Sequence, residues 1–238
     1  MSYTILSVGF EFPGGDVENI ALGEGRSILD GDIIVFRPGI PHRNSTRTYL
    51  GKDSLTEAAS FKSREVLAHW HSEILAALDA GKLIVVFLAS PDEMYADTGE
   101  HQYSGTGRNT RVTNVVDILS SYRALPVKAT VRASSGTGIK PAGELKFLAT
   151  YWKEFGEQST YEAFLEGQFP NVLLKTRSGE RIVGAAIRKG AGALLLLPIL
   201  NYDEESFVEE RQAIVTTTLC GRKLVSPMAA GSRRLSPA

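Results

Sequence analysis

Polar and aromatic side chains follow three of the strands that the sequence predicts. They are Phe12, Arg37, His42, Asp92 and Glu93, with Ser90 beside the last two. The carboxyl ends of neighbouring parallel strands meet at one edge of a sheet, and open α/β sheets bind their ligands at that edge. The first five residues are therefore predicted to line a binding site for a small polar ligand.

Four residues have the chemistry of catalytic groups. His42 and Asp92 are of the types that transfer protons, while the Ser90 hydroxyl and the Cys220 thiol are of the types that attack a substrate. Ser90 has no glycine around it, so it lacks the sharp turn that presents the nucleophile in α/β hydrolases. Cys220 has cationic neighbours but no adjacent base. These four residues are candidates, and no catalytic residue is assigned.

The sequence predicts no metal site and no cofactor. Cys220 is the only cysteine, which excludes a cysteine-rich zinc or iron–sulfur centre. His69 and His71 lie about 200° apart around a helix and cannot share one metal ion. His69 shares a helix face with Glu65 and Glu73, but a solvated helix face shows the same pattern. No Gly-x-Gly pair completes a dinucleotide fingerprint, and no P-loop is present.

A small basic turn, Arg188-Lys189-Gly190, separates two apolar runs between residues 181 and 200. The glycines lie between two predicted strands and not before a helix, so no helix dipole would favour an anion there. We therefore predict a β-turn. The alternative is that Arg188 and Lys189 contact a ligand.

Composition excludes a general attraction to polyanions. The chain has 238 residues, a formal net charge of −1 and a pI near 6.4, so no overall field draws in nucleic acid or an anionic membrane. We expect one α/β domain over residues 1–221 and a flexible basic tail over 222–238, and we expect no nucleic-acid binding except through that tail. No signal peptide and no apolar run of about 20 residues is present, which predicts a cytoplasmic protein without membrane contact.

Apolar runs alternate with helical patterns along the chain. Strands are expected over residues 3–10, 17–22, 32–40 and 83–91, and a helix lies between Ser54 and Gly81, with Ser54 and Glu57 at capping-box spacing. Residues 92–141 are the least regular part, with a short helix expected over 115–122 and a strand over 127–133. Further helices are expected over 144–155, 160–167 and 202–221. Strands are expected over 171–176, 181–188 and 193–200, and Ser178-Gly179 forms a hairpin turn.

Three of these segments resemble one known family. The runs ILDGDIIVFRPGI, ALDAGKLIVVFLASP and SGERIVGAAIRKGAGALLLLP are similar to the flavodoxin-like domain of class I glutamine amidotransferase-like proteins, over about two thirds of the chain. The resemblance implies an α/β fold, a flavodoxin-like three-layer sandwich with a mainly parallel sheet and a C-terminal antiparallel hairpin. Active members carry a cysteine nucleophile where this chain has Ser90-Pro91-Asp92, and their late His-x-Glu pair is missing here. The resemblance therefore implies a catalytically degenerate member.

The predicted function is a non-catalytic amidotransferase-like module that serves as a binding or scaffolding subunit of a bacterial multi-protein system. Such a subunit keeps an exposed apolar or aromatic surface for its protein partner, for which Trp152, Phe155, Tyr161 and Phe164 are candidates. One alternative is a hydrolase or transferase that uses the loops at the strand ends. A second alternative is a sensor of nucleotides or other small ligands.

Overall fold

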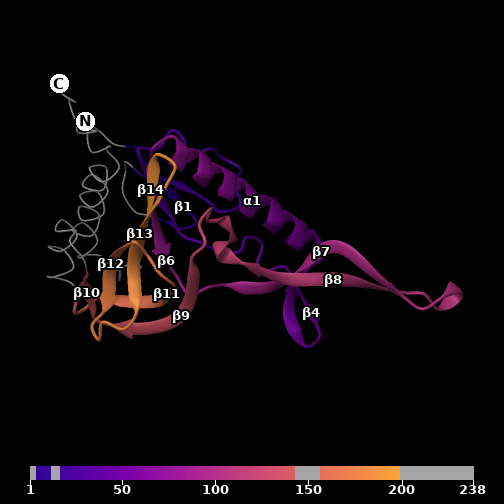
Figure 1. Cartoon of the computed structure of the whole chain (residues 1–238). Coiled ribbons are helices and arrows are strands. Elements are labelled where there is room, and N and C mark those ends of the chain that lie inside the picture. The colour runs from indigo at the N-terminus through magenta and orange to yellow at the C-terminus, as the bar shows by residue number, and fades with distance from the viewer. Residues whose placement is uncertain (1–3, 12–16, 143–155, 199–238) are drawn as a thin grey trace, which may run out of the picture.

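The computed structural model describes residues 4–11, 17–142 and 156–198, which form two β-sheets and one α-helix (Figure 1). The larger sheet has a parallel half and an antiparallel half. Its parallel half contains, in spatial order, β2 (Val17–Ile20), β1 (Ile5–Val8), β3 (Ile33–Phe36), β6 (Leu83–Leu88) and β14 (Gly192–Pro198).

The antiparallel half continues from β14 through three more strands and a branch. The strands are β13 (Ile182–Lys189), β12 (Asn171–Thr176) and β10 (Ile139–Pro141), and the branch from β13 contains β11 (Thr160–Glu166) and β9 (Thr130–Thr137). The smaller sheet contains β4 (Thr46–Tyr49), β5 (Lys52–Leu55), β7 (Glu93–Ser104) and β8 (Arg111–Ser120). Two short 3₁₀ turns, η1 (Gly107–Asn109) and η2 (Ser121–Ala124), follow β7 and β8 respectively.

The parallel strands form the core because they are apolar on both faces. Every residue of β1, β3, β6 and β14 is buried, as expected for a parallel sheet that is covered on both sides. The helix α1 (Glu57–Asp79) covers one face. There Trp70 is fully buried, lies 6.2 Å from Phe36 between ring centroids, and donates a 2.7 Å hydrogen bond from Nε1 to the carbonyl of Leu22.

Residues at the two ends of α1 explain where the helix begins and ends. Thr56 caps the first turn by accepting a 3.3 Å hydrogen bond from the amide of Ala59, so the predicted cap at Ser54 is wrong. Ser54 lies two residues earlier, buried in β5. After the helix Gly81 adopts a φ of 78°, which confirms the predicted glycine stop. None of the helices in the described part of the chain combines the length and apolarity needed to span a bilayer.

The basic turn between β13 and β14 is a two-residue hairpin turn, as predicted. Lys189 pairs with Gly192, and Gly190 between them has a φ of 60°. The turn packs closely on the end of α1, since a Cβ atom on Gly190 would lie 2.5 Å from Oδ1 of Asp79. This contact and the positive φ together favour glycine at this position.

The predicted flavodoxin-like sandwich is wrong, because the described residues contain fourteen strands and only one α-helix. The helices expected over residues 115–122 and 160–167 are largely strands β8 and β11. In β11 the buried residues Ala163 and Leu165 alternate with less buried ones, which is the two-residue period of a strand. The helices expected over 144–155 and 202–221, and the tail 222–238, lie outside the described residues.

Several other predicted elements are confirmed. The strands expected over residues 32–40 and 83–91 are the neighbouring parallel strands β3 and β6. The late strands are β12, β13 and β14, and the turn at Ser178-Gly179 is closed by a 2.8 Å hydrogen bond from the Gly179 amide to the Thr176 carbonyl.

We expect Trp70→Ala to lower the free energy of unfolding by about 3 to 5 kcal/mol, because it empties a fully buried site between α1 and the sheet. Trp70→Phe keeps most of the ring but loses the bond to Leu22, and should cost about 1 to 3 kcal/mol. Denaturant unfolding measures both values. A loss below about 1 kcal/mol for Trp70→Ala would show that this contact is not part of the core.

Candidate functional site

Strands β7 and β8, with the η1 turn between them, form an arm that projects from the body of the molecule (Figure 1). The two strands pair from Glu93 opposite Ser120 to Ser104 opposite Arg111. All residues from 99 to 113 are exposed. A two-stranded ribbon is only marginally stable in water by itself, so the base of the arm must hold it in place.

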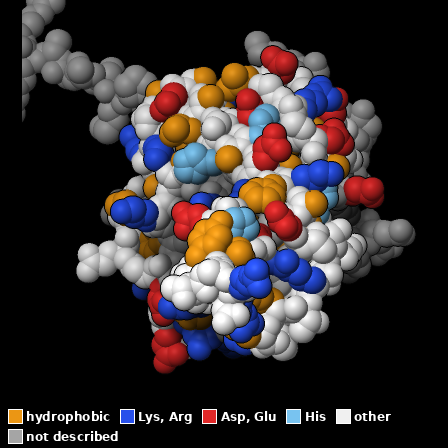
Figure 2. Space-filling model, turned by 90° about the vertical axis from the view of Figure 1, so that its right-hand side faces the viewer, with side chains coloured by type: hydrophobic (Ala, Val, Ile, Leu, Met, Phe, Trp, Pro, Cys, Tyr) orange, Lys and Arg blue, Asp and Glu red, His pale blue; other side chains and the backbone are white. Residues whose placement is uncertain are grey.

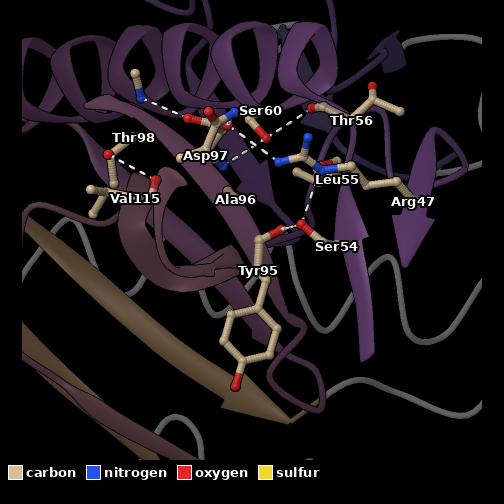
Figure 3. A network of polar contacts seen from close by, with 12 residues as sticks. Arg47, Ser54, Leu55, Thr56, Ser60, Tyr95, Ala96, Asp97, Thr98 and Val115 are labelled. Carbon is tan, nitrogen blue, oxygen red and sulfur yellow. Dashed lines mark hydrogen bonds and ion pairs between the residues drawn. The ribbon is translucent and has the colours of Figure 1, made fainter. Parts of the chain in front are cut away.

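A buried carboxylate holds the base of the arm. Asp97 of β7 is 1% exposed and accepts three hydrogen bonds (Figure 3). The donors are the side chain of Asn114 on β8 (2.6 Å), the backbone amide of Gly99 (2.9 Å) and the guanidinium of Arg47 on β4 (3.2 Å). One side chain therefore joins three strands of the smaller sheet.

The first turns of α1 extend this network. The backbone amide of Asp97 donates to the hydroxyl of Ser60 (3.0 Å), which donates in turn to the carbonyl of Thr56 (2.9 Å). Arg64 donates from Nε to the Asp97 carbonyl (3.0 Å) and forms an ion pair with Asp117 on β8. Both strands of the arm are thus fastened to the helix that covers the larger sheet.

The network determines the charge state of Asp97. Burial alone would raise the pKa of this carboxyl group, but the hydrogen bonds from Gly99, Asn114 and Arg47 outweigh it and lower the pKa below its ordinary value. Asp97 is therefore an anion at neutral pH, and it neutralises the partly buried Arg47. In the described residues Nε of Arg47 is a buried donor without an acceptor.

A bulge separates the anchored base from the exposed part of the arm. The pairing register shifts between Asp97 and His101, and within this shift Gly99 has a φ of 81°. A Cβ atom on Gly99 would lie 3.1 Å from the ring of Phe61 on α1. The bend therefore needs a glycine, and it marks the point beyond which the arm leaves the helix.

Exposed apolar and aromatic side chains gather on the arm and its neighbours. Six large ones are exposed in the described residues: Leu29, Leu50, Phe61, Tyr103, Val112 and Ile118. Five of the six belong to the smaller sheet, its β4–β5 turn or the adjoining first turns of α1, and Leu29 alone lies elsewhere. On the side from which the arm projects, apolar side chains lie among charged ones (Figure 2).

The aromatic surface predicted from sequence lies elsewhere. Tyr161 and Phe164 are half-buried and pack against the core on the face of the larger sheet opposite α1. Trp152 and Phe155 lie outside the described residues.

The structure does not assemble the predicted catalytic group. His42 is exposed, has a φ of 59°, and lines a hollow of about 350 Å³ beside Glu65 and His69. Asp92 forms a 3.2 Å ion pair with Arg43 instead. Within the described ranges, no hydrogen bond or ion pair joins Ser90, His42 and Asp92. Cys220 lies outside them.

The residues of the predicted ligand site at the sheet edge differ in their burial. Arg37 follows β3 and is half-buried, and Glu93 is exposed at the start of the arm. Beside Arg37 lies Tyr122, whose hydroxyl donates to the carbonyl of Ala89 (2.7 Å) and accepts from its amide (3.0 Å). Burial raises the pKa of Tyr122, so this hydroxyl keeps its proton and holds the end of β6 in place. Phe12 lies outside the described residues.

The helix face that carries Glu65, His69 and Glu73 binds a loop. Glu73 accepts hydrogen bonds from the Ser27 hydroxyl (2.8 Å) and the Ile28 amide (2.9 Å), and His69 Nε2 lies 3.1 Å from the Arg26 carbonyl. The described ranges contain no group of three His, Cys, Asp or Glu side chains that could hold a metal.

Sequence reasoning missed the arm and its anchor. The segment around Val112 is rich in β-branched residues, Tyr103 lies on the other side of the tip, and a Gly-Thr-Gly run lies between them. That pattern is a hairpin signal. The role of Asp97 could not have been found, because its side-chain partners Asn114 and Arg47 lie 17 and 50 residues away in sequence.

Comparisons with other proteins do not identify a relative. No protein-family model matches the chain, and no curated protein matches it. The amidotransferase-like family therefore stays a prediction, although the fold that it implied is wrong.

We expect Asp97→Asn to lower the free energy of unfolding by about 2 to 4 kcal/mol, because it removes the charge that neutralises the partly buried Arg47. Asp53→Asn is the matched control, since Asp53 is an exposed acid on the neighbouring strand β5 and should change stability by less than about 0.5 kcal/mol. Denaturant unfolding at neutral pH measures both. Equal effects of the two variants would contradict the anchoring role.

The pH dependence of stability should also depend on Asp97. A carboxyl group with a lowered pKa in the folded state stabilises the protein above its unfolded pKa, and this stabilisation is lost as the pH falls through the folded pKa. The parent protein should therefore lose more stability than Asp97→Asn below about pH 4. Parallel pH profiles for the two would refute the lowered pKa.

Proposed function

We propose that this protein is a non-catalytic binding subunit of a multi-protein system, and that the arm docks on a protein partner. The observation that carries the proposal is the gathering of exposed apolar side chains on the arm and its sheet. Tyr103 is 70% exposed and Val112 is 52% exposed, and apolar side chains that gather on one surface mark an interaction site.

The arrangement of these side chains fits a continuous contact. Tyr103 and Val112 are directly opposite each other across the arm and so share one face. Ile118 lies an even number of residues from Val112 on β8, which places it on the same face of that strand. Leu50, 86% exposed, lies apart from these three, in the turn between β4 and β5. We call Tyr103, Val112 and Ile118 the arm surface.

The backbone of the arm offers a second means of binding a partner. In the described residues β8 pairs with β7 alone, so its other edge presents unpaired amide and carbonyl groups along ten residues. An extended segment of a partner can add to such an edge as a further strand, and its side chains then meet the apolar ones beside it.

The anchored base favours tight binding. The network around Asp97 fixes the direction in which the arm leaves the body. A ribbon that is already positioned loses less conformational freedom when a partner binds, so more of the contact energy appears as affinity.

The test uses the tagged full chain in its source cells, with covalent crosslinking before isolation. The double variant Tyr103→Asp and Val112→Asp places charges in the centre of the arm surface, and recovery of specific partners should fall about tenfold or more. Quantitative mass spectrometry measures the recovery. Leu29→Asp is the matched control, because Leu29 is exposed but lies away from the smaller sheet.

Two outcomes would overturn the proposal. One is the recovery of the same proteins, in the same amounts, with the double variant. The other is self-association of the purified chain through the arm, seen by sedimentation as an oligomer that the double variant abolishes. The arm would then join copies of this chain and not a different protein.

A further inference from the structure

A second surface, remote from the tip of the arm, has the character of a ligand site. A hollow of about 560 Å³ lies between α1, the segment that follows η2, the β11–β12 connection and the end of β13. Ligand pockets for small molecules have volumes of this order. None of the residues of the arm lines this hollow.

The charges around the hollow all have one sign. Its ionisable lining side chains are His71, Lys128, Arg188 and Lys189, and no carboxylate lines it. Lys128 and Lys189 form no ion pair with the described carboxylates. The ammonium group of Lys189 donates to the carbonyl of Pro126, which holds this cation at the rim and leaves its other protons available. A concave surface with several cations and no acid favours an anion.

The remaining lining is apolar, with one amide. The apolar walls of the hollow consist of Leu125, Val127, Phe169 and Ile187, each of which is buried or half-buried. Their positions are fixed because Leu125 belongs to the core and the other three pack against it. Gln168 is exposed at the rim and provides both a hydrogen-bond donor and an acceptor.

We propose that this hollow binds a free mononucleotide. The phosphate pairs with Lys128 and Lys189, since ammonium groups form strong charge-assisted bonds to phosphate oxygens. The planar base lies against Phe169 and the aliphatic wall, where an aromatic face contributes by stacking. Gln168 hydrogen-bonds the edge of the base. A site with only cations would take any small anion, whereas the apolar wall selects an anion that carries a ring.

Isothermal titration calorimetry of the full chain tests the assignment. The probes are the 5′-monophosphates and 5′-diphosphates of adenosine, guanosine, cytidine and uridine, with inorganic pyrophosphate and the unphosphorylated nucleosides as partial ligands. At least one nucleotide should bind about tenfold tighter than both of its parts, because phosphate and ring are recognised together. Its affinity should fall as salt is raised.

Substitutions test which residues contact the nucleotide. Lys128 is exposed, so Lys128→Ala should leave folding intact and weaken nucleotide binding about tenfold, and Lys128→Glu should weaken it further. Gln168→Ala should reduce the differences between bases with a smaller loss of affinity. Arg108→Ala is the matched control, since Arg108 is a basic residue exposed at the tip of the arm, and it should bind nucleotide as the parent does.

Three results would overturn the proposal. They are the absence of heat with every nucleotide at millimolar concentration, pyrophosphate binding as tightly as the best nucleotide, and unchanged affinity in Lys128→Glu. Tighter binding of a short single-stranded oligonucleotide than of every mononucleotide would overturn the assignment to a free ligand. None of these results bears on partner binding by the arm, for which Lys128→Ala serves as a further control.

Discussion

The buried carboxylate of Asp97 determines where the arm lies, and the rest of the exposed surface depends on that position. An isolated buried charge is very unfavourable, so this side chain is tolerated only with its donors in place. Arg47, Gly99 and Asn114 provide those donors from three strands. The network is therefore complete only when the whole smaller sheet has formed, which couples the arm to the folding of its neighbours.

The helix α1 connects this network to the core. Trp70 and Ile74 on its buried face pack against the parallel sheet, while Ser60 and Arg64 near its beginning contact the base of the arm. A rigid element with both contacts keeps the arm in a fixed direction relative to the sheet. The arm surface and the hollow lined by Lys128 and Lys189 lie at different places around α1, since the hollow contacts α1 only at His71. The two proposed binding functions can thus be tested separately by substitution.

Short apolar runs explain both the successes and the errors of prediction from sequence. The six residues of β6 are all apolar, and their length and bulk suit a strand that is buried on both faces. In β8, by contrast, Val115, Val116, Ile118 and Leu119 are spaced as one face of a helix would be, and the same spacing occurs in a strand at the base of a ribbon. Periodicity over so short a segment does not distinguish the two structures. Pairing with β7 makes this segment a strand and not a helix.

The sequence by itself determined which apolar runs are core strands, the one described helix with its glycine stop, and the turn at Gly190, because each depends on residues that are close together in the chain. The tertiary structure alone decided that Asp92 pairs with Arg43 and not with the neighbouring His42. It also decided the anchor, since Arg47 and Asp97 are 50 residues apart. Contacts of this kind depend on strand order and register, and these are set by the packing of the whole core and not by local spacing.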